Sequence, residues 1–156
     1  MKNNKGFSLV ELIIVIAIMA VLVGVLAPTY LQYVEKTKKS NDVSTVDSIV
    51  NAIEIAAIDP EVHATNWTTL TVTITGSGVN FTKGASDADT MMDAVKEIVG
   101  DAADIKLKST KWDATTNEVE FTATNNGGKV AFKYGTGNGS KEFAKYATSI
   151  TKIANS

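Results

Sequence analysis

Histidine, cysteine and clustered acids most often carry chemistry in proteins, and this sequence offers few of them. His63 is the only histidine among 156 residues, and there is no cysteine. A serine-type triad or a multi-histidine metal site would have His63 as its sole histidine. A thiol nucleophile, a zinc–thiolate site and a disulfide scaffold are excluded. We predict that His63 lies in an exposed loop and that the protein is not an enzyme and has no cofactor.

Three other patterns could bind a ligand, and each has a simpler explanation. Asp87, Asp89 and Asp93 could suggest calcium, but the bidentate glutamate of a calcium loop is missing, and acids are common where a helix begins. The segment GTGNGSK, 135–141, resembles a phosphate loop with the wrong lysine–serine order, so we predict a turn. Three glycosylation sequons are expected by chance in a chain so rich in Asn and Thr. They begin at Asn66, Asn80 and Asn138.

Glu11 is the residue whose type and position are most unusual. It interrupts the stretch 7–27, in which 18 of 21 residues are apolar. As a helix this stretch is about 31 Å long, which matches the hydrocarbon core of a bilayer. A carboxylate in such a helix costs about 3 kcal/mol and is usually retained because it pairs with a cation. Either Glu11 reaches the headgroups from the helix end, or its cation comes from another chain or from processing.

The flanks of the apolar stretch also fit a membrane helix. Tyr30 and Tyr33 occupy positions typical of interfacial aromatics, and three lysines follow within six residues. A cleaved secretory signal peptide is the alternative. Its small-residue cleavage site, 25–27, is followed by Pro28, which normally blocks signal peptidase, so we expect the segment to be retained. The numbers of lysines on the two sides of the apolar stretch are nearly equal, so the positive-inside rule does not decide the orientation. The short leader and the polar remainder favour an amino terminus on the inside of the membrane.

The segment KGFSLVELIIVIAIMAVLVGVLAP, residues 5–28, resembles the amino-terminal signature of type IV prepilins. That family has a short basic leader ending in glycine, a cleavage site before phenylalanine, and a glutamate at the fifth mature position. The residues that match this signature are Lys2, Lys5, Gly6, Phe7, Glu11 and Pro28.

The resemblance implies processing followed by assembly. A prepilin peptidase would cleave after Gly6 and methylate the new amino terminus at Phe7. That ammonium could pair with Glu11 of a neighbouring subunit and so set the register of a filament, because an unpaired charge is costly at low dielectric. The partners implied are further copies of the chain, the peptidase and methyltransferase, the inner pilus-assembly machinery and the membrane.

The implied function is that of a major type IV pilus subunit in adhesion, aggregation, biofilm formation or twitching motility. The chain would be a single-pass protein of the cytoplasmic membrane before assembly and part of an extracellular fibre afterwards. A pseudopilin of a type II-like secretion or competence system shares the same motif and is the first alternative. A membrane-anchored binding protein or enzyme is the second, although the polar remainder offers no motif for it.

Charge argues against nucleic acid as a partner. The formal net charge is −2, and all 15 basic residues are lysine, which lacks the planar fork that favours phosphate and base recognition. Removal of Lys2 and Lys5 would leave 13 lysines against 17 acids.

The helical pattern continues beyond the apolar stretch. Apolar residues recur with 3-4-3-4 spacing until Asp59-Pro60, which predicts a single helix over 7–58. The members of this stripe are Val43, Val46, Ile49, Val50, Ile53, Ala56 and Ala57. The segment 35–42 has no apolar residue and is predicted as a solvated connector within the helix; the resemblance places it near the outer part of a filament core.

Pro28 lies inside this helix and removes the hydrogen bond to the carbonyl of Gly24. We therefore expect a kink between Gly24 and Pro28 or, as the resemblance implies, local loss of helix there on assembly.

The remainder predicts an α+β fold, with the long helix packed on a small antiparallel sheet as in pilins. The predicted organisation is a leader, 1–6, an apolar helix, 7–28, its amphipathic half, 29–59, and a head, 60–156. Strands are expected at 69–75, 105–109, 118–123 and 129–134, with a hairpin turn at Asn126-Gly127. Helices are expected at 86–99 and in the last segment, around Phe143, Tyr146, Ile150 and Ile153.

The absence of cysteine separates this chain from the many pilins that close a carboxy-terminal loop with a disulfide. In this respect it resembles most the cysteine-free major pilins of Gram-positive bacteria. The head would then rely on core packing, and we expect its aromatic core to consist of Trp67, Trp112, Phe121, Phe132 and Phe143.

Overall fold

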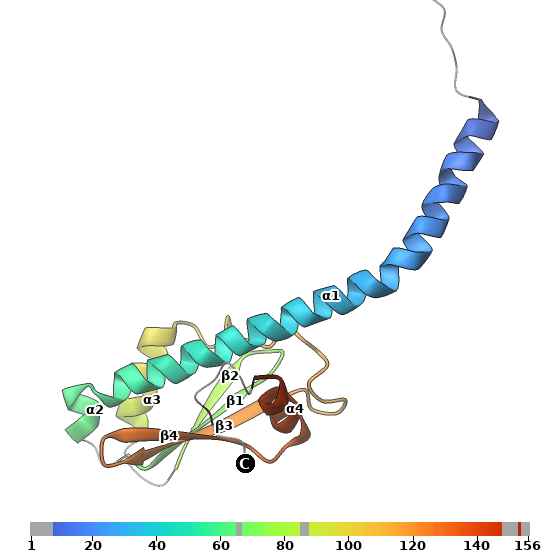
Figure 1. Cartoon of the computed structure of the whole chain (residues 1–156). Coiled ribbons are helices and arrows are strands. Elements are labelled where there is room, and N and C mark those ends of the chain that lie inside the picture. Colours follow the sequence, from blue (N-terminus) through green and yellow to red (C-terminus); the bar gives the residue numbers. More distant parts are fainter. Residues whose placement is uncertain (1–7, 65–66, 85–87, 148–152, 154–156) are drawn as a thin grey trace, which may run out of the picture. The chain divides into compact units, whose positions relative to one another are not determined.

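The computed structural model describes residues 8–64, 67–84, 88–147 and 153, in two compact units that divide after Thr37. One helix, α1 (Leu9–Ala57), runs through both units and ends one residue earlier than predicted (Figure 1). The second unit, which begins at Lys38, is the head. The division falls inside the segment predicted as the amphipathic half of the helix, and the predicted four-part organisation stays a prediction.

The head contains a four-stranded antiparallel sheet in the order β2-β1-β3-β4. Its strands are β1 (Thr69–Ile74), β2 (Val79–Lys83), β3 (Val119–Asn126) and β4 (Lys129–Tyr134). Buried and half-buried residues alternate along β1 and β3, so that one face is apolar and the other carries threonines. The register places Val72 opposite both Phe81 and Phe121, which concentrates apolar side chains on the inner face.

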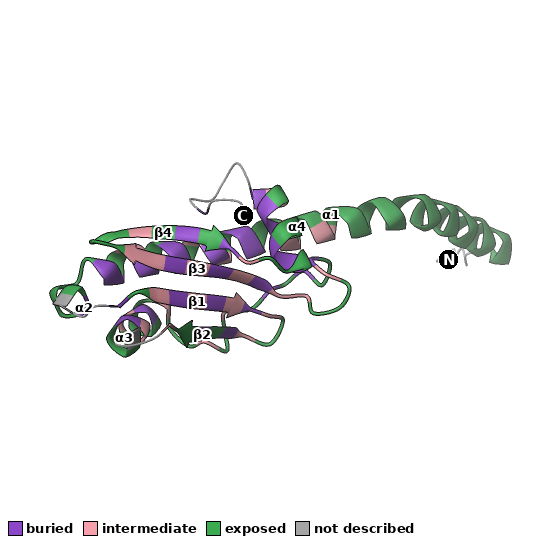
Figure 2. Ribbon diagram, turned by 90° about the horizontal axis from the view of Figure 1, so that it is seen from below, coloured by how far each residue is buried: buried purple, intermediate pink, exposed green. Residues whose placement is uncertain are grey.

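Three shorter helices complete the head: α2 (Pro60–Ala64), α3 (Ala88–Val99) and α4 (Asn138–Ala147). α3 contacts β1 and β2, whereas α4 contacts β3 and β4. Figure 2 shows the sheet in front of the part of α1 that belongs to the head, with α3 beside β2 and α4 at one end of β3 and β4. The α+β architecture predicted from the sequence, a long amino-terminal helix packed with a small antiparallel sheet, is confirmed.

The core lies between α1 and the sheet. Every residue of the predicted apolar stripe of α1 is buried. The five predicted core aromatics are all buried as well, with Phe121 and Phe143 fully so. Phe143 lies at the centre of an aromatic cluster, because its ring centroid is 4.7 Å from that of Trp112 and 5.8 Å from that of Tyr134. Truncating such a side chain costs about 3–5 kcal/mol, so this cluster is a major source of stability in a chain without disulfides.

One predicted strand is absent, and one observed strand was not predicted. Residues 105–109 are extended but belong to no strand, because their backbone donors are used elsewhere. Leu107 donates to the carbonyl of Thr75, and the next two amides donate to a side chain of α1. Conversely, β2 was not predicted, although residues 79–83 alternate directly after a turn that contains Gly76 and Gly78.

Turn and helix starts also differ from the prediction. The hairpin between β3 and β4 turns at Gly127 and Gly128, whose φ angles are 62° and 91°, one residue later than expected. Both angles lie in the left-handed region that glycine adopts without strain. The predicted turn at 135–140 is only partly correct, because α4 already begins at Asn138. His63 is exposed as expected, but it lies in α2 rather than in a loop.

Candidate functional site

The first unit presents an apolar helical surface that nothing in the described chain covers. Residues 8–33 are all exposed, and the large apolar side chains among them are 47–74% exposed. In the described part of the chain, α1 is the one helix whose length and composition would allow it to cross a membrane. An apolar surface of this size is stable only against lipid or against other protein.

Glu11 lies in the first turn of α1 and closes a capping box with Ser8. Its Oε2 accepts a hydrogen bond of 2.8 Å from the backbone amide of Ser8, and the Ser8 hydroxyl accepts one of 3.4 Å from the amide of Val10. These bonds satisfy two amides that a helix end leaves without an intrahelical partner. The pattern Ser-x-x-Glu could have been found in the sequence. It gives Glu11 a local structural role that the sequence analysis missed.

The other residues of the predicted processing and assembly site differ in what the structure describes. Lys2, Lys5, Gly6 and Phe7 lie outside the described residues. The helix is continuous through Gly24 and Pro28 in the single chain. Apart from the adjoining helix backbone and chain neighbours, no described atom lies within 4 Å of the position that a Gly24 Cβ would occupy.

Asp42 is the site residue that sequence reasoning assigned wrongly. The segment 35–42 was predicted as a solvated connector, yet Asp42 is 0% exposed. Its carboxylate accepts three hydrogen bonds: 2.6 Å from the Lys108 amide, 3.0 Å from the Ser109 amide and 2.7 Å from Nε1 of Trp112. Three donors compensate for the loss of water around the charge, which is why the residue can be buried.

A signal for this burial was present in the sequence. Asp42 lies four residues before Val46, and intervals of three and four residues continue through Ile49 and Ile53 along the buried face. A helix position on that face points into the head whatever its residue type. The carboxylate therefore attaches the long segment between α3 and β3 to the beginning of the head.

The groups around Asp42 hold this attachment in place. The ammonium of Lys39, one turn before Asp42, lies 4.5 Å from the centroid of the Trp112 ring, a cation–π distance. Asn117 accepts a hydrogen bond from the Trp112 amide and donates one to the carbonyl of Ser109. It does so at a φ of 44°, in the left-handed region that asparagine tolerates best among residues other than glycine.

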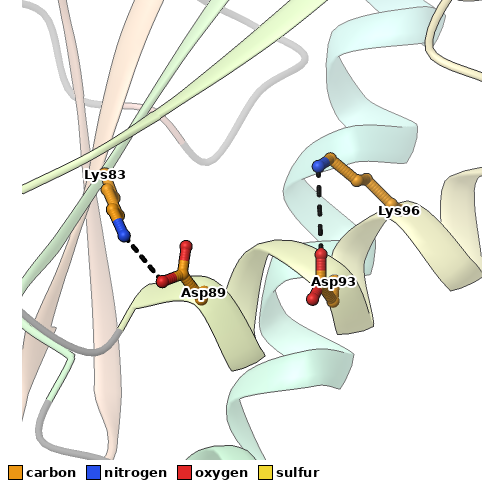
Figure 3. A network of polar contacts seen from close by, with 4 residues as sticks. All are labelled: Lys83, Asp89, Asp93 and Lys96. Carbon is orange, nitrogen blue, oxygen red and sulfur yellow. Dashed lines mark hydrogen bonds and ion pairs between the residues drawn. The ribbon is translucent and has the colours of Figure 1, made fainter.

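The acids considered for calcium do not converge on a common point. Figure 3 shows Asp89 pointing to Lys83, at 2.6 Å, and Asp93 pointing to Lys96, at 3.9 Å. Both pairs are solvent-exposed and each contributes less than about 1 kcal/mol. Asp87 lies outside the described residues, and no cluster of potential metal ligands occurs in the described ranges.

The remaining candidate motifs have structural roles or untested ones. In the phosphate-loop-like segment, the Ser140 hydroxyl accepts a hydrogen bond from the amide of Glu120, and Lys141 belongs to α4. Of the sequons, Asn80 lies on β2 and Asn138 begins α4, while Asn66 is outside the described residues.

A long helix, apolar and exposed over its first part and packed on a small antiparallel sheet over its second, defines a pilin-like protein. Residues 1–27 match the family model described as the prokaryotic N-terminal methylation motif. These residues therefore carry the methylation motif, in the segment whose sequence resembles the signature of type IV prepilins.

Curated relatives agree over a longer stretch. The chain is 39% identical over 59 residues to a fimbrial protein of Pseudomonas aeruginosa, which is 38% of each chain. It is 36% identical over 56 residues to the type IV major fimbrial protein FimA of Dichelobacter nodosus, 36% of each chain. With the type IV wide pilus major component PilA4 of Thermus thermophilus it shares 38% over 73 residues, 45% of this chain and 53% of the relative.

Each of these matches thus spans between about a third and a half of the relative's length. The likeness to cysteine-free pilins of Gram-positive bacteria is not tested by them and stays a prediction. No solved structure matches the chain significantly.

The Asp42 attachment yields the first prediction. Asp42→Ala leaves three buried donors without an acceptor, and we expect the free energy of unfolding of the head to decrease by about 3–5 kcal/mol. Asp47→Ala, a half-buried acid on the same helix, is the matched control and should change it by less than about 1 kcal/mol. Urea unfolding of the full chain in detergent, followed by tryptophan fluorescence, measures both. Equal losses in the two variants would show that the three hydrogen bonds do not anchor the head.

Proposed function

We propose that this protein is a structural subunit, the major pilin, of a type IV pilus, and that it acts by self-assembly rather than by catalysis. The observation that carries the proposal is the exposed apolar helix with a single carboxylate, Glu11, inside a sequence that matches the methylation motif. The relatives, which are named as fimbrial and major pilus proteins, support the same role.

The physical reason for assembly is the uncovered surface of α1. Each fully buried Leu, Ile, Val or Met side chain contributes about 1.5–3 kcal/mol relative to exposure in water. Lipid provides this burial before assembly, and the same side chains of neighbouring subunits provide it in a fibre. Since lipid and the fibre core are both apolar, transfer of the helix between them costs little hydrophobic free energy. The position of a subunit in the fibre therefore depends on more specific contacts, such as charge pairs.

Processing creates one such contact. In the proposed sequence of events a prepilin peptidase cleaves between Gly6 and Phe7, removes Lys2 and Lys5 with the leader, and methylates the new amino terminus. The amino terminus lies on the inner side of the cytoplasmic membrane at that stage, and the head lies on the outer side. The Phe7 ammonium then pairs with Glu11 of the next subunit, and assembly machinery extracts the chain into an extracellular fibre.

Glu11 then has two roles that a substitution can separate. As the N3 residue of a capping box it needs only an acceptor oxygen, which glutamine also has. As the partner of an ammonium it needs a negative charge, which glutamine lacks.

We therefore predict that Glu11→Gln keeps the helix start and still inserts into the membrane but yields few or no fibres. Ser8→Ala, which removes the capping hydroxyl and keeps the charge, should assemble nearly as the natural chain does. Electron microscopy of surface fibres, with membrane fractionation as the test of insertion, measures both properties. Fibre counts from Glu11→Gln equal to those of the natural chain would refute the pairing.

The same preparation discriminates the alternatives. Long fibres made of this chain at its natural expression level favour a pilin, whereas short fibres found only on overexpression favour a pseudopilin. A chain that remains in the membrane under both conditions is a membrane-anchored binding protein instead.

A further prediction concerns Gly24 and Pro28. The helix is intact there in the single chain, but Pro28 leaves the Gly24 carbonyl without its usual donor, and glycine weakens the helix further. We expect the helix to open locally between these residues when subunits pack. Hydrogen exchange should then be faster over residues 23–28 in fibres than over the flanking helical segments. Full protection of these amides in the fibre would contradict the prediction.

A further inference from the structure

Positive charge in the head is concentrated in two short stretches. From Lys38 onward the sequence has 12 lysines and 15 acids. Five of the lysines lie at 38–39 and 106–111, and neither stretch contains an acid. Outside them, seven lysines face all 15 acids, so the rest of the head is strongly acidic. We call this set of five the lysine patch; it consists of Lys38, Lys39, Lys106, Lys108 and Lys111.

The Asp42 carboxylate brings the two stretches together, although they are about 70 residues apart in sequence. Asp42 lies about one turn of α1 after Lys38 and Lys39, and its carboxylate accepts a hydrogen bond from the backbone amide of Lys108. Along the attached segment, exposure alternates: Lys106 and Lys108 are exposed, whereas Leu107 and Ser109 are buried. The lysine side chains of this extended segment thus face solvent while its backbone is fixed to the helix.

Acids near the patch compensate part of its charge, and one of them is Glu35, which lies about one turn of α1 before Lys38 and Lys39. Asp42 is buried and already accepts three hydrogen bonds. The carboxylate of Glu142 forms an ion pair of 2.6 Å with the ammonium of Lys145. The hydrogen bond and the positive charge of Lys145, with a smaller contribution from the charge of Lys39, hold the pKa of Glu142 below its usual value. Asp104 and Asp113 flank the second stretch and are the remaining acids close to it in sequence.

Chain connectivity keeps Lys38, the first residue of the patch, near the end of the apolar helix. Tyr33, the last of the exposed aromatic residues of α1, precedes Lys38 by five residues. Five residues span at most about 17 Å even when fully extended. Tyrosines at this position of a membrane helix lie at headgroup level, and lysines attract anionic lipid over a range set by the Debye length of about 8–10 Å.

We propose that the lysine patch binds the phosphates of anionic phospholipids on the outer face of the membrane while the subunit awaits assembly. The inference rests on the membrane-stored stage of the proposed function. The patch adds the lysines of the 106–111 segment to those of the helix itself, so that the head, and not only α1, contacts the bilayer surface. Extraction into a fibre has to break these contacts. Because the contacts are electrostatic, their strength depends on the salt concentration.

Membrane lipid is favoured over a second copy because the chain itself delivers the patch to a bilayer surface. An acidic surface of another subunit has to arrive by diffusion, whereas Lys38 is tied to the apolar helix by the chain itself. The lipid partner also needs no shape complementarity, which suits the exposed side chains of Lys106, Lys108 and Lys111.

The test uses the full chain in nanodiscs of phosphatidylcholine, with or without phosphatidylglycerol. A small acylating reagent modifies exposed lysines, and mass spectrometry gives the rate at each site. We expect acylation of Lys106, Lys108 and Lys111 to be at least about threefold slower in the anionic discs, as a few close phosphates would cause. At about 1 M salt, where the Debye length is about 3 Å, the difference should disappear.

Matched variants show whether the patch acts as a unit. Lys106→Gln with Lys108→Gln should reduce the lipid-dependent slowing that remains at Lys111. Lys129→Gln with Lys133→Gln removes two exposed lysines from an equally extended segment, β4, and should leave the slowing at Lys111 unchanged.

Two results would overturn the proposal. One is an equal acylation rate of the patch lysines in neutral and anionic discs that both contain the chain. The other is slowing that follows protein concentration in neutral discs, which would assign the patch to a second copy. Failure of the chain to enter nanodiscs is a different result, since it contradicts the membrane-stored stage of the proposed function.

Discussion

The helix α1 changes from fully exposed to partly buried along its length, and the rest of the structure depends on where this change occurs. Over residues 8–33, α1 exposes its apolar side chains on every side, whereas from Val43 onward it buries one stripe in the head. Asp42 stands at the beginning of that stripe, fully buried and bound to three donors. A charge that is buried and fully hydrogen-bonded fixes position more strictly than an apolar side chain, because any displacement leaves it unsatisfied. We regard this carboxylate as the point that fixes the first turns of α1 within the head to the segment between α3 and β3.

Asp42 and Glu11 are both carboxylates of α1, but they have different roles. Asp42 finds its donors within the chain, so its contribution is made once, on folding. Among the described residues, Glu11 has a local partner, the amide of Ser8, and a capping bond alone uses little of what its charge can do. In the account proposed above, processing supplies the cation that completes the pair. Folding thus fixes the head, and processing makes the helix competent to assemble.

Much of this could be predicted from the sequence, and the failures have physical causes. Periodicity identified the buried stripe of α1, and residue type identified the aromatic core, because burial of large apolar residues dominates folding. β4 was predicted with its observed bounds, and its turn was misplaced by only one residue, since two successive glycines compete for it. Residues 105–109 resembled a strand by composition, but their amides bind Asp42 and Thr75 instead of a neighbouring strand. Asp42 itself was assigned to solvent because residue type was weighed above its position on the helix face, and the three donors that permit its burial lie more than 60 residues away.

The central claim is that this chain is a processed subunit whose helix becomes the core of a fibre. The most direct test is the intact mass and amino-terminal residue of the chain purified from surface fibres. The account predicts a chain that lacks Met1 to Gly6 and begins with an N-methylated Phe7. Fibres that contain the chain beginning at Met1, or at Pro28 after removal of the whole apolar segment, would contradict it.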